Sequence, residues 1–169
     1  MRQCFRKILA LLFFNFTVLC SLSVQASVRE YWIAAEKVTW NYAPSNKNLI
    51  HPNDSLDVWG KTLNYTKYRY IGYSDGSYSK PLPQPEWVGI LGPQLRAAVG
   101  DTLKVHFLNK TDRPVSMHPH GLKYDKDNEG ADGGKGGSIA PGKSFTYTWV
   151  VDEDAGPGPK DLSSVVWLY

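Results

Sequence analysis

The chain has 169 residues and a formal net charge of +3, with Lys and Arg scattered among Asp and Glu and no basic run. This distribution argues against a nucleic-acid partner and against binding to an anionic membrane surface. Both cysteines, Cys4 and Cys20, lie close to the N-terminus. A mature chain that lacks them has no disulfide, no thiolate metal site and no thiol nucleophile.

Residues 1–26 have the three-part layout of a secretory signal peptide. A basic start precedes an apolar run over residues 8–22, and small residues end at Ala26. The apolar run is too short and too interrupted for a transmembrane anchor. We therefore expect cleavage after Ala26, export to the extracellular space or the periplasm, and a single mature domain over residues 27–169 without a membrane span.

Short segments in which apolar and polar residues alternate dominate the rest of the chain, and glycine and proline separate them. The clearest strand covers residues 102–109, where polar side chains such as His106 alternate with apolar ones. Several short strands with turn signals between them predict an all-β fold, either a sandwich or a Greek-key barrel. The other expected elements are strands over residues 31–40, 65–73 and 144–151, a buried strand end over 87–93, and an extended segment over 115–124.

The last five residues form an apolar run, Val165-Val166-Trp167-Leu168-Tyr169. Such a run is typical of a strand inside a sheet. Natural domains seldom stop there, because the edge that the strand completes would be left without its continuation. The sequence therefore predicts a domain that is truncated at its C-terminus.

The motif His118-Pro119-His120-Gly121 is the strongest candidate site. In an extended segment, residues i and i+2 project to the same side, so the two imidazoles project together. Pro119 removes a ladder donor, which favours an edge or a site over a central strand, and Gly121 lets another group approach the backbone closely. Imidazole binds copper, zinc, iron and nickel. The spacing alone leaves a solvated histidine pair open as the alternative.

The remaining polar motifs favour ordinary surface roles. His106 is expected on the outer face of its strand and His51 in a solvated loop. Residues 125–130 resemble the start of an EF-hand loop, but the twelfth position is Gly136, where a glutamate is required, and flanking helices are lacking. A looser calcium site or a solvated acidic turn stays open for this loop.

Three triplets are N-glycosylation sequons, beginning at Asn53, Asn64 and Asn109. They matter only if the protein passes through a eukaryotic secretory pathway. Such triplets are also common by accident, so the sequence does not decide which of them is used.

Several stretches resemble the first domain of multicopper ferroxidases, the family of ceruloplasmin, hephaestin and the A domains of coagulation factors V and VIII. The similarity covers nearly all of residues 29–169. It is carried by EWVGILGP at residues 86–93, VGDTLKVHFLN at 99–109, RPVSMHPHG at 113–121, the opening strand at 31–42, and the shorter segments 129–131, 140–142 and 147–149. The resemblance implies a cupredoxin-like (plastocyanin-like) Greek-key β-barrel that contributes one His-x-His pair to a trinuclear copper centre.

The resemblance also implies individual roles. His118 would match a type 2 copper ligand and His120 a type 3 ligand, with the remaining pairs supplied by further cupredoxin domains of the same oxidase. The implied reaction takes single electrons from a donor such as Fe(II) and reduces O2 to water.

Two departures limit this implication. The mature chain has no cysteine and therefore no type 1 copper, so these residues alone are expected to be inactive. The family's calcium loop carries acidic residues just before the position of Pro141, where this chain has Gly136 and Gly137, which argues against calcium.

Taken together, the sequence predicts the N-terminal plastocyanin-like domain of a secreted, ferroxidase-like multicopper oxidase. Two alternatives stay open: a non-catalytic copper-binding or interaction module of the same fold, and part of a copper nitrite reductase. A second His-x-His motif beyond Tyr169 would favour the oxidase.

Overall fold

The computed structural model describes residues 26–60, 62–162 and 164–169, so the predicted signal peptide lies outside the described residues except for Ala26. The long regular elements are strands, which confirms the predicted all-β class. They are β1 (Val28–Asn41), β2 (Asn64–Tyr73), β3 (Thr102–Asn109) and β4 (Ser144–Val150).

The helices are single 3₁₀ turns of three residues each, and within the described ranges none is long and apolar enough to cross a membrane. They are η1 (Asp57–Trp59), η2 (Glu86–Val88), η3 (Lys126–Asn128) and η4 (Glu153–Ala155).

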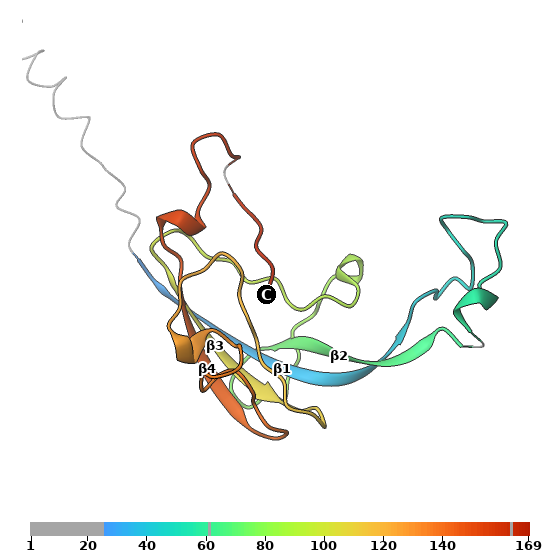
Figure 1. Ribbon diagram of the computed structural model, residues 1–169, viewed down its shortest axis with the longest axis horizontal. Helices are drawn as coiled ribbons and strands as arrows, with labels where there is room; N and C mark the ends of the chain where they lie inside the picture. Colours follow the sequence, from blue (N-terminus) through green and yellow to red (C-terminus); the bar gives the residue numbers. More distant parts are fainter. Residues whose placement is uncertain (1–25, 61, 163) are drawn as a thin grey trace, which may run out of the picture.

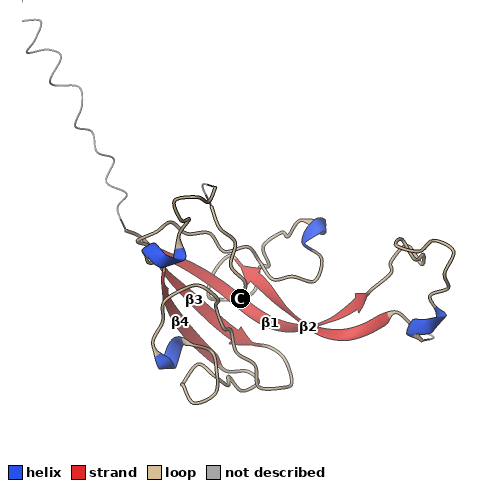
Figure 2. Cartoon of the chain, turned by 45° about the horizontal axis from the view of Figure 1, so that its top comes forward, coloured by secondary structure: helices blue, strands red, loops and turns tan. Residues whose placement is uncertain are grey.

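The four strands form one sheet in the order β2-β1-β3-β4 (Figure 2). β1 is antiparallel to β2 and parallel to β3, whereas β3 and β4 are antiparallel. β1 pairs with β3 only over residues 28–35 but with β2 over residues 32–41. The outer halves of β1 and β2 therefore leave the sheet as a two-stranded arm that carries η1 near its tip (Figure 1).

One face of the sheet holds the core. Buried and partly exposed residues alternate along the whole of β3, so that Leu103, Val105 and Phe107 point to the same side. Tyr147 and Trp149 of β4 are buried beside them, and the rings of Phe107 and Tyr147 lie 6.2 Å apart. The predicted alternation of β3 is thus confirmed, since burying every second side chain removes apolar surface from water while the other side chains stay hydrated.

Irregular extended segments cover this face. Residues 115–124 lie across the core with Met117 fully buried, and they join the rest of the fold through isolated bridges between Val115 and Ile139 and between Lys123 and Val150. The predicted extended segment is therefore confirmed. This segment is not a regular strand of the sheet, and it carries the two candidate ligands, His118 and His120.

The prediction of a buried strand end over residues 87–93 is wrong. Trp87 belongs to η2 and is 80% exposed, and the backbone reverses at Gly89, where φ is +60°. Prolines at both ends of this stretch remove ladder donors, so its apolar residues do not form a strand.

The expectation of a strand over residues 165–169 is also wrong, because this segment has no regular structure. Val166 and Leu168 are largely exposed. Tyr169 nevertheless packs against the core, and its hydroxyl donates to the Pro93 carbonyl at 2.5 Å. The apolar run is thus held by single side chains and not by a ladder.

Candidate metal centre

The backbone around the histidine pair is held by the hydroxyls of two tyrosines, of which Tyr147 is buried and Tyr70 partly buried. The Met117 N–H donates to the hydroxyl of Tyr147 at 3.1 Å, and the hydroxyl of Tyr70 donates to the Ser116 carbonyl at 2.5 Å. Burial raises the pKa of Tyr147 to about 12, so this hydroxyl keeps its proton and donates it to a further carbonyl at 2.6 Å. Pro119 is itself fully buried. The two histidines therefore project from a fixed stretch of chain.

The two imidazoles lie close together, with ring centroids 5.1 Å apart and planes 81° apart. Nδ1 of His118 is 2.6 Å from the carbonyl oxygen of Glu129. Because a carbonyl oxygen only accepts, Nδ1 of His118 carries a proton, and in the neutral imidazole Nε2 then has the lone pair. Metal-bound histidines commonly show this arrangement, in which a carbonyl fixes the tautomer and the orientation of the ring.

Glu129 reaches His118 because Gly130 lets two segments of chain touch. Gly130 has a φ of +75°, and a Cβ at this position would lie 1.7 Å from the Met117 carbonyl oxygen. The hydroxyl of Ser116 donates to the Gly130 carbonyl at 2.6 Å. Only glycine has both the conformational freedom and the size for this contact.

The C-terminal run contacts the chain at His120 and Gly121. Gly121 has a φ of +71°, and a Cβ there would lie 2.3 Å from the indole of Trp167. The indole N–H donates to the Ala155 carbonyl at 2.9 Å, and the His120 N–H donates to the Leu168 carbonyl at 2.8 Å. The prediction that Gly121 permits a close approach is confirmed, and the approaching group is Trp167.

The two imidazoles suit copper as a ligand pair. His118 presents a free imidazole nitrogen from a rigid segment, and His120 lies beside it. Imidazole nitrogen suits copper. Among the residues that the structure describes, no cluster of three or more His, Cys, Asp or Glu side chains could hold a metal ion. Two imidazoles leave most coordination positions open, so a site built on this pair needs ligands from elsewhere.

The structure does not bring the other two histidines to the pair. His106 stacks on Trp32 with ring centroids 5.2 Å apart, and its Nε2 lies 3.6 Å from a carboxylate oxygen of Glu30. It belongs to the outer face of the sheet, as predicted. His51 is exposed in the loop before η1, also as predicted.

Two carboxylates of the acidic loop are engaged by neighbouring groups. Asp125 accepts the N–H of Asn128 at 3.0 Å and caps η3. The ammonium of Lys135 lies 2.6 Å from the Asp127 carboxylate, and its hydrogen bond holds the pKa of Asp127 below the ordinary value. The carboxylates of Asp125 and Asp127 therefore have partners within the loop itself.

Comparisons with known proteins identify relatives of this chain. Residues 88–157 match the family model described as multicopper oxidase. The chain is 40% identical to mouse ferroxidase HEPHL1 over 86% of its own length and 14% of that protein. It is 36% identical to rat hephaestin over 89% of its length and 15% of that protein. It is 37% identical to mouse coagulation factor V over 85% of its length and 7% of that protein.

Among solved structures, the chain aligns with a multicopper oxidase from Pseudomonas thermotolerans at 22% identity and a TM-score of 0.46, covering 76% of this chain and 23% of the other. The chain spans only a small part of the curated relatives that it matches. The predicted resemblance and the predicted all-β class are confirmed. This chain belongs to the multicopper oxidase family.

Proposed function

We propose that residues 27–169 are the N-terminal plastocyanin-like domain of a secreted, ferroxidase-like multicopper oxidase, and that residues 1–26 are its signal peptide. In this proposal His118 ligates the type 2 copper and His120 a type 3 copper of a trinuclear centre. Further cupredoxin domains of the same oxidase supply the other ligands, O2 is the electron acceptor, and Fe(II) or another one-electron donor is the reductant.

The observation that carries this proposal is the hydrogen bond between Nδ1 of His118 and the Glu129 carbonyl, which leaves Nε2 free to ligate. A solvated histidine pair would not need a fixed tautomer. The identity to animal ferroxidases over most of the chain supports copper as the metal.

When bound, copper would supply one-electron redox chemistry. The residues of this chain bind and orient. His118 and His120 would provide the imidazole nitrogens, and the Glu129 carbonyl would keep the His118 ring in one orientation. Trp167 packs on Gly121, directly after the pair.

The test is made in the complete oxidase, with His118→Ala and His120→Ala as separate variants. We expect loss of the type 2 signal in paramagnetic resonance for the first, loss of the type 3 absorption for the second, and at least a tenfold loss of O2 consumption with Fe(II) for both. His51→Ala is the matched control, because His51 is exposed and distant in sequence from the pair. Unchanged copper content and turnover in both variants would falsify the proposal.

A second candidate is a copper-binding or interaction module without turnover. Coagulation factor V is a relative at 37% identity, and its name refers to coagulation and not to oxidation. A complete protein that holds copper through His118 and His120 yet consumes no O2 with Fe(II) would favour this second function.

A further inference from the structure

The three sequons occupy different places in the fold. Asn53 lies in the loop before η1 and Asn64 begins β2, so both belong to the arm that projects from the sheet (Figure 1). Asn109 is the last residue of β3, at the edge of the core. The structure can therefore separate sequons that the sequence alone treats as equal.

The side-chain amide of Asn109 is fully used inside the protein. Asn109 is 0% exposed, and its Nδ2 donates to the carbonyls of Arg113 and Ile139, both at 2.7 Å. Its Oδ1 accepts the N–H of Thr111 at 2.8 Å and the hydroxyl of the same residue at 2.7 Å. A sugar on Nδ2 would replace one of these donors and would need room that a closely packed interior does not have.

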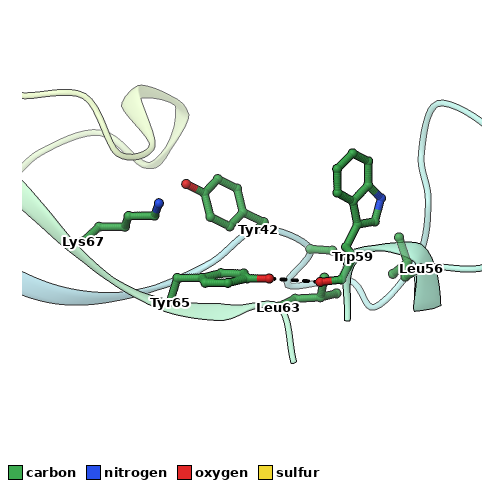
Figure 3. A pocket seen from close by; sticks show the side chains of 7 residues that line it. Tyr42, Leu56, Trp59, Leu63, Tyr65 and Lys67 are labelled. Atoms are coloured by element: carbon green, nitrogen blue, oxygen red, sulfur yellow. Dashed lines mark hydrogen bonds between the residues drawn. The ribbon is translucent and has the colours of Figure 1, made fainter. Parts of the chain in front are cut away.

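Asn53 and Asn64 are both exposed, and so are the hydroxyl residues of their sequons, Ser55 and Thr66. Successive side chains of a strand point to opposite faces, so Asn64 and Thr66 share one face of β2 and Tyr65 faces the other. Tyr65 lines an apolar pocket of the arm, and its hydroxyl donates to the Trp59 carbonyl at 3.0 Å (Figure 3). A glycan on Asn64 would therefore be attached on the face of β2 opposite Tyr65.

We propose that Asn53 and Asn64 carry N-linked glycans in the exported protein and that Asn109 carries none. The donor is an oligosaccharide on a polyprenyl pyrophosphate, and the transferase is that of a eukaryotic secretory pathway. The amide nitrogen forms a bond to the anomeric carbon of the oligosaccharide, the bond from that carbon to the pyrophosphate oxygen breaks, and the amide loses one proton. No electron donor or acceptor is involved.

This modification depends on export and is independent of copper. The predicted signal peptide would deliver the chain to the transferase, and the curated relatives at 36–40% identity are mammalian proteins. A chain that fails to bind copper can still carry both glycans, so failure of the proposed function and failure of this inference are distinguishable.

The experiment is production of the chain with its own residues 1–26 in an animal cell line, with a known secreted glycoprotein as positive control. The secreted protein is treated with peptide N-glycosidase, which converts each glycosylated Asn to Asp, and peptides are analysed by mass spectrometry. We expect conversion at Asn53 and Asn64 and an unmodified amide at Asn109. Asn53→Gln and Asn64→Gln should each lower the apparent mass on a denaturing gel by the contribution of one glycan.

Ser55→Ala and Thr66→Ala keep the asparagines and remove only the sequon hydroxyls, so each should reproduce the mobility of the corresponding Gln variant. A glycan on Asn109 of the folded protein, bare amides at both arm positions, or retention of an unglycosylated chain in the cytosol would each overturn the proposal.

Discussion

The backbone N–H of Ser27 lies 3.0 Å from Oδ1 of Asp101, and the Ser27 hydroxyl donates to the same oxygen at 2.8 Å. Asp101 is 1% exposed, accepts the N–H of Ala98 at 2.8 Å and forms an ion pair with Arg29. The carboxylate therefore ties the beginning of β1 to the turn before β3. The Ala98 N–H, then Arg29 and Ser27, hold the pKa of Asp101 well below its ordinary value.

We predict that Asp101 makes the protein sensitive to acid. A carboxyl group whose pKa is lower in the folded than in the unfolded state stabilises the fold above its unfolded pKa, about 4, and loses this contribution as the pH falls toward the folded value. Asp101→Asn should lower the free energy of unfolding at neutral pH and flatten its decline below about pH 4. Denaturant unfolding at several pH values measures both effects. Asp132→Asn, at an exposed position, is the control, and equal pH profiles for the two variants would contradict the prediction.

Cleavage after Ala26 would turn the Ser27 N–H into an ammonium group beside the same carboxylate. We predict that mass spectrometry of the secreted protein finds Ser27 at the N-terminus. The chain that starts at Ser27 should also have a higher Tm than its N-acetylated form, which keeps an N–H 3.0 Å from Asp101 but has no charge. An N-terminus within residues 1–26 would refute the cleavage site, and equal Tm values would refute the ion pair.

The hydroxyl of Tyr147 should stabilise both the core and the site. Tyr147→Phe leaves the Met117 N–H and the Gly136 carbonyl without their partner, and both groups are buried. An unpaired buried group costs about 1–3 kcal/mol, so we expect a loss of at least that size in the free energy of unfolding. Tyr124→Phe is the matched control, since Tyr124 lies beside His118 and the described residues show no hydrogen bond from its hydroxyl. A loss in the control as large as in Tyr147→Phe would show that the two hydrogen bonds do not matter.

Substitution of Gly121 and Gly142 by alanine separates the cost of backbone strain from the cost of a steric clash. Both have left-handed backbone, with φ of +71° and +74°, but a Cβ at Gly142 would meet nothing within 4 Å. Gly142→Ala should therefore cost only the backbone strain, roughly 1–2 kcal/mol. Gly121→Ala should cost more and change the tryptophan fluorescence, because Trp167 has to move. Equal losses in denaturant unfolding would mean that Trp167 does not rest on Gly121 in solution.

Residues 27–169 without further domains should not sustain oxidation by O2. At the candidate site they bring together two imidazoles and no thiolate, so we expect copper to bind weakly and to be removed quickly by a chelator. Oxygen consumption with copper and Fe(II) should equal that of the His118→Ala, His120→Ala double variant. Sustained consumption above that control would mean that the site needs no partner domain.

The sequence predicted best where one local pattern decides the structure. β3 was expected over residues 102–109 and has those bounds, because its successive side chains point alternately to the core and to solvent. β1 extends beyond the predicted segment at residues 28–30, where it pairs with β3. At their other ends β1 and β2 are one residue longer than predicted, because Asn41 and Asn64 pair with each other. Residues 87–93 contain apolar side chains but also Gly89 and a final proline, and the backbone preferences of these residues overrode the apolar pattern.

Only part of the candidate site could be predicted from the sequence. His118 and His120 carry a readable motif, and Gly121 correctly indicated a close contact. The Glu129 carbonyl that orients His118 is a backbone atom, which every residue has, so no sequence signal marks it. The indole of Trp167 is placed by the path of the C-terminal segment, and a glycine predicts room for a neighbour without identifying it.

The number of strands that flank β1 changes along its length. From Trp32 to Ala35, β1 has a strand on each side, whereas from Glu36 to Asn41 only β2 holds it. A ribbon of two strands is barely stable by itself in water, so the tip can separate without disturbing the core. Amide hydrogens should therefore exchange with solvent in a gradient along a single strand, slowly where it is flanked and quickly toward Asn41. Proteases would first cut the exposed loop that joins β1 to β2.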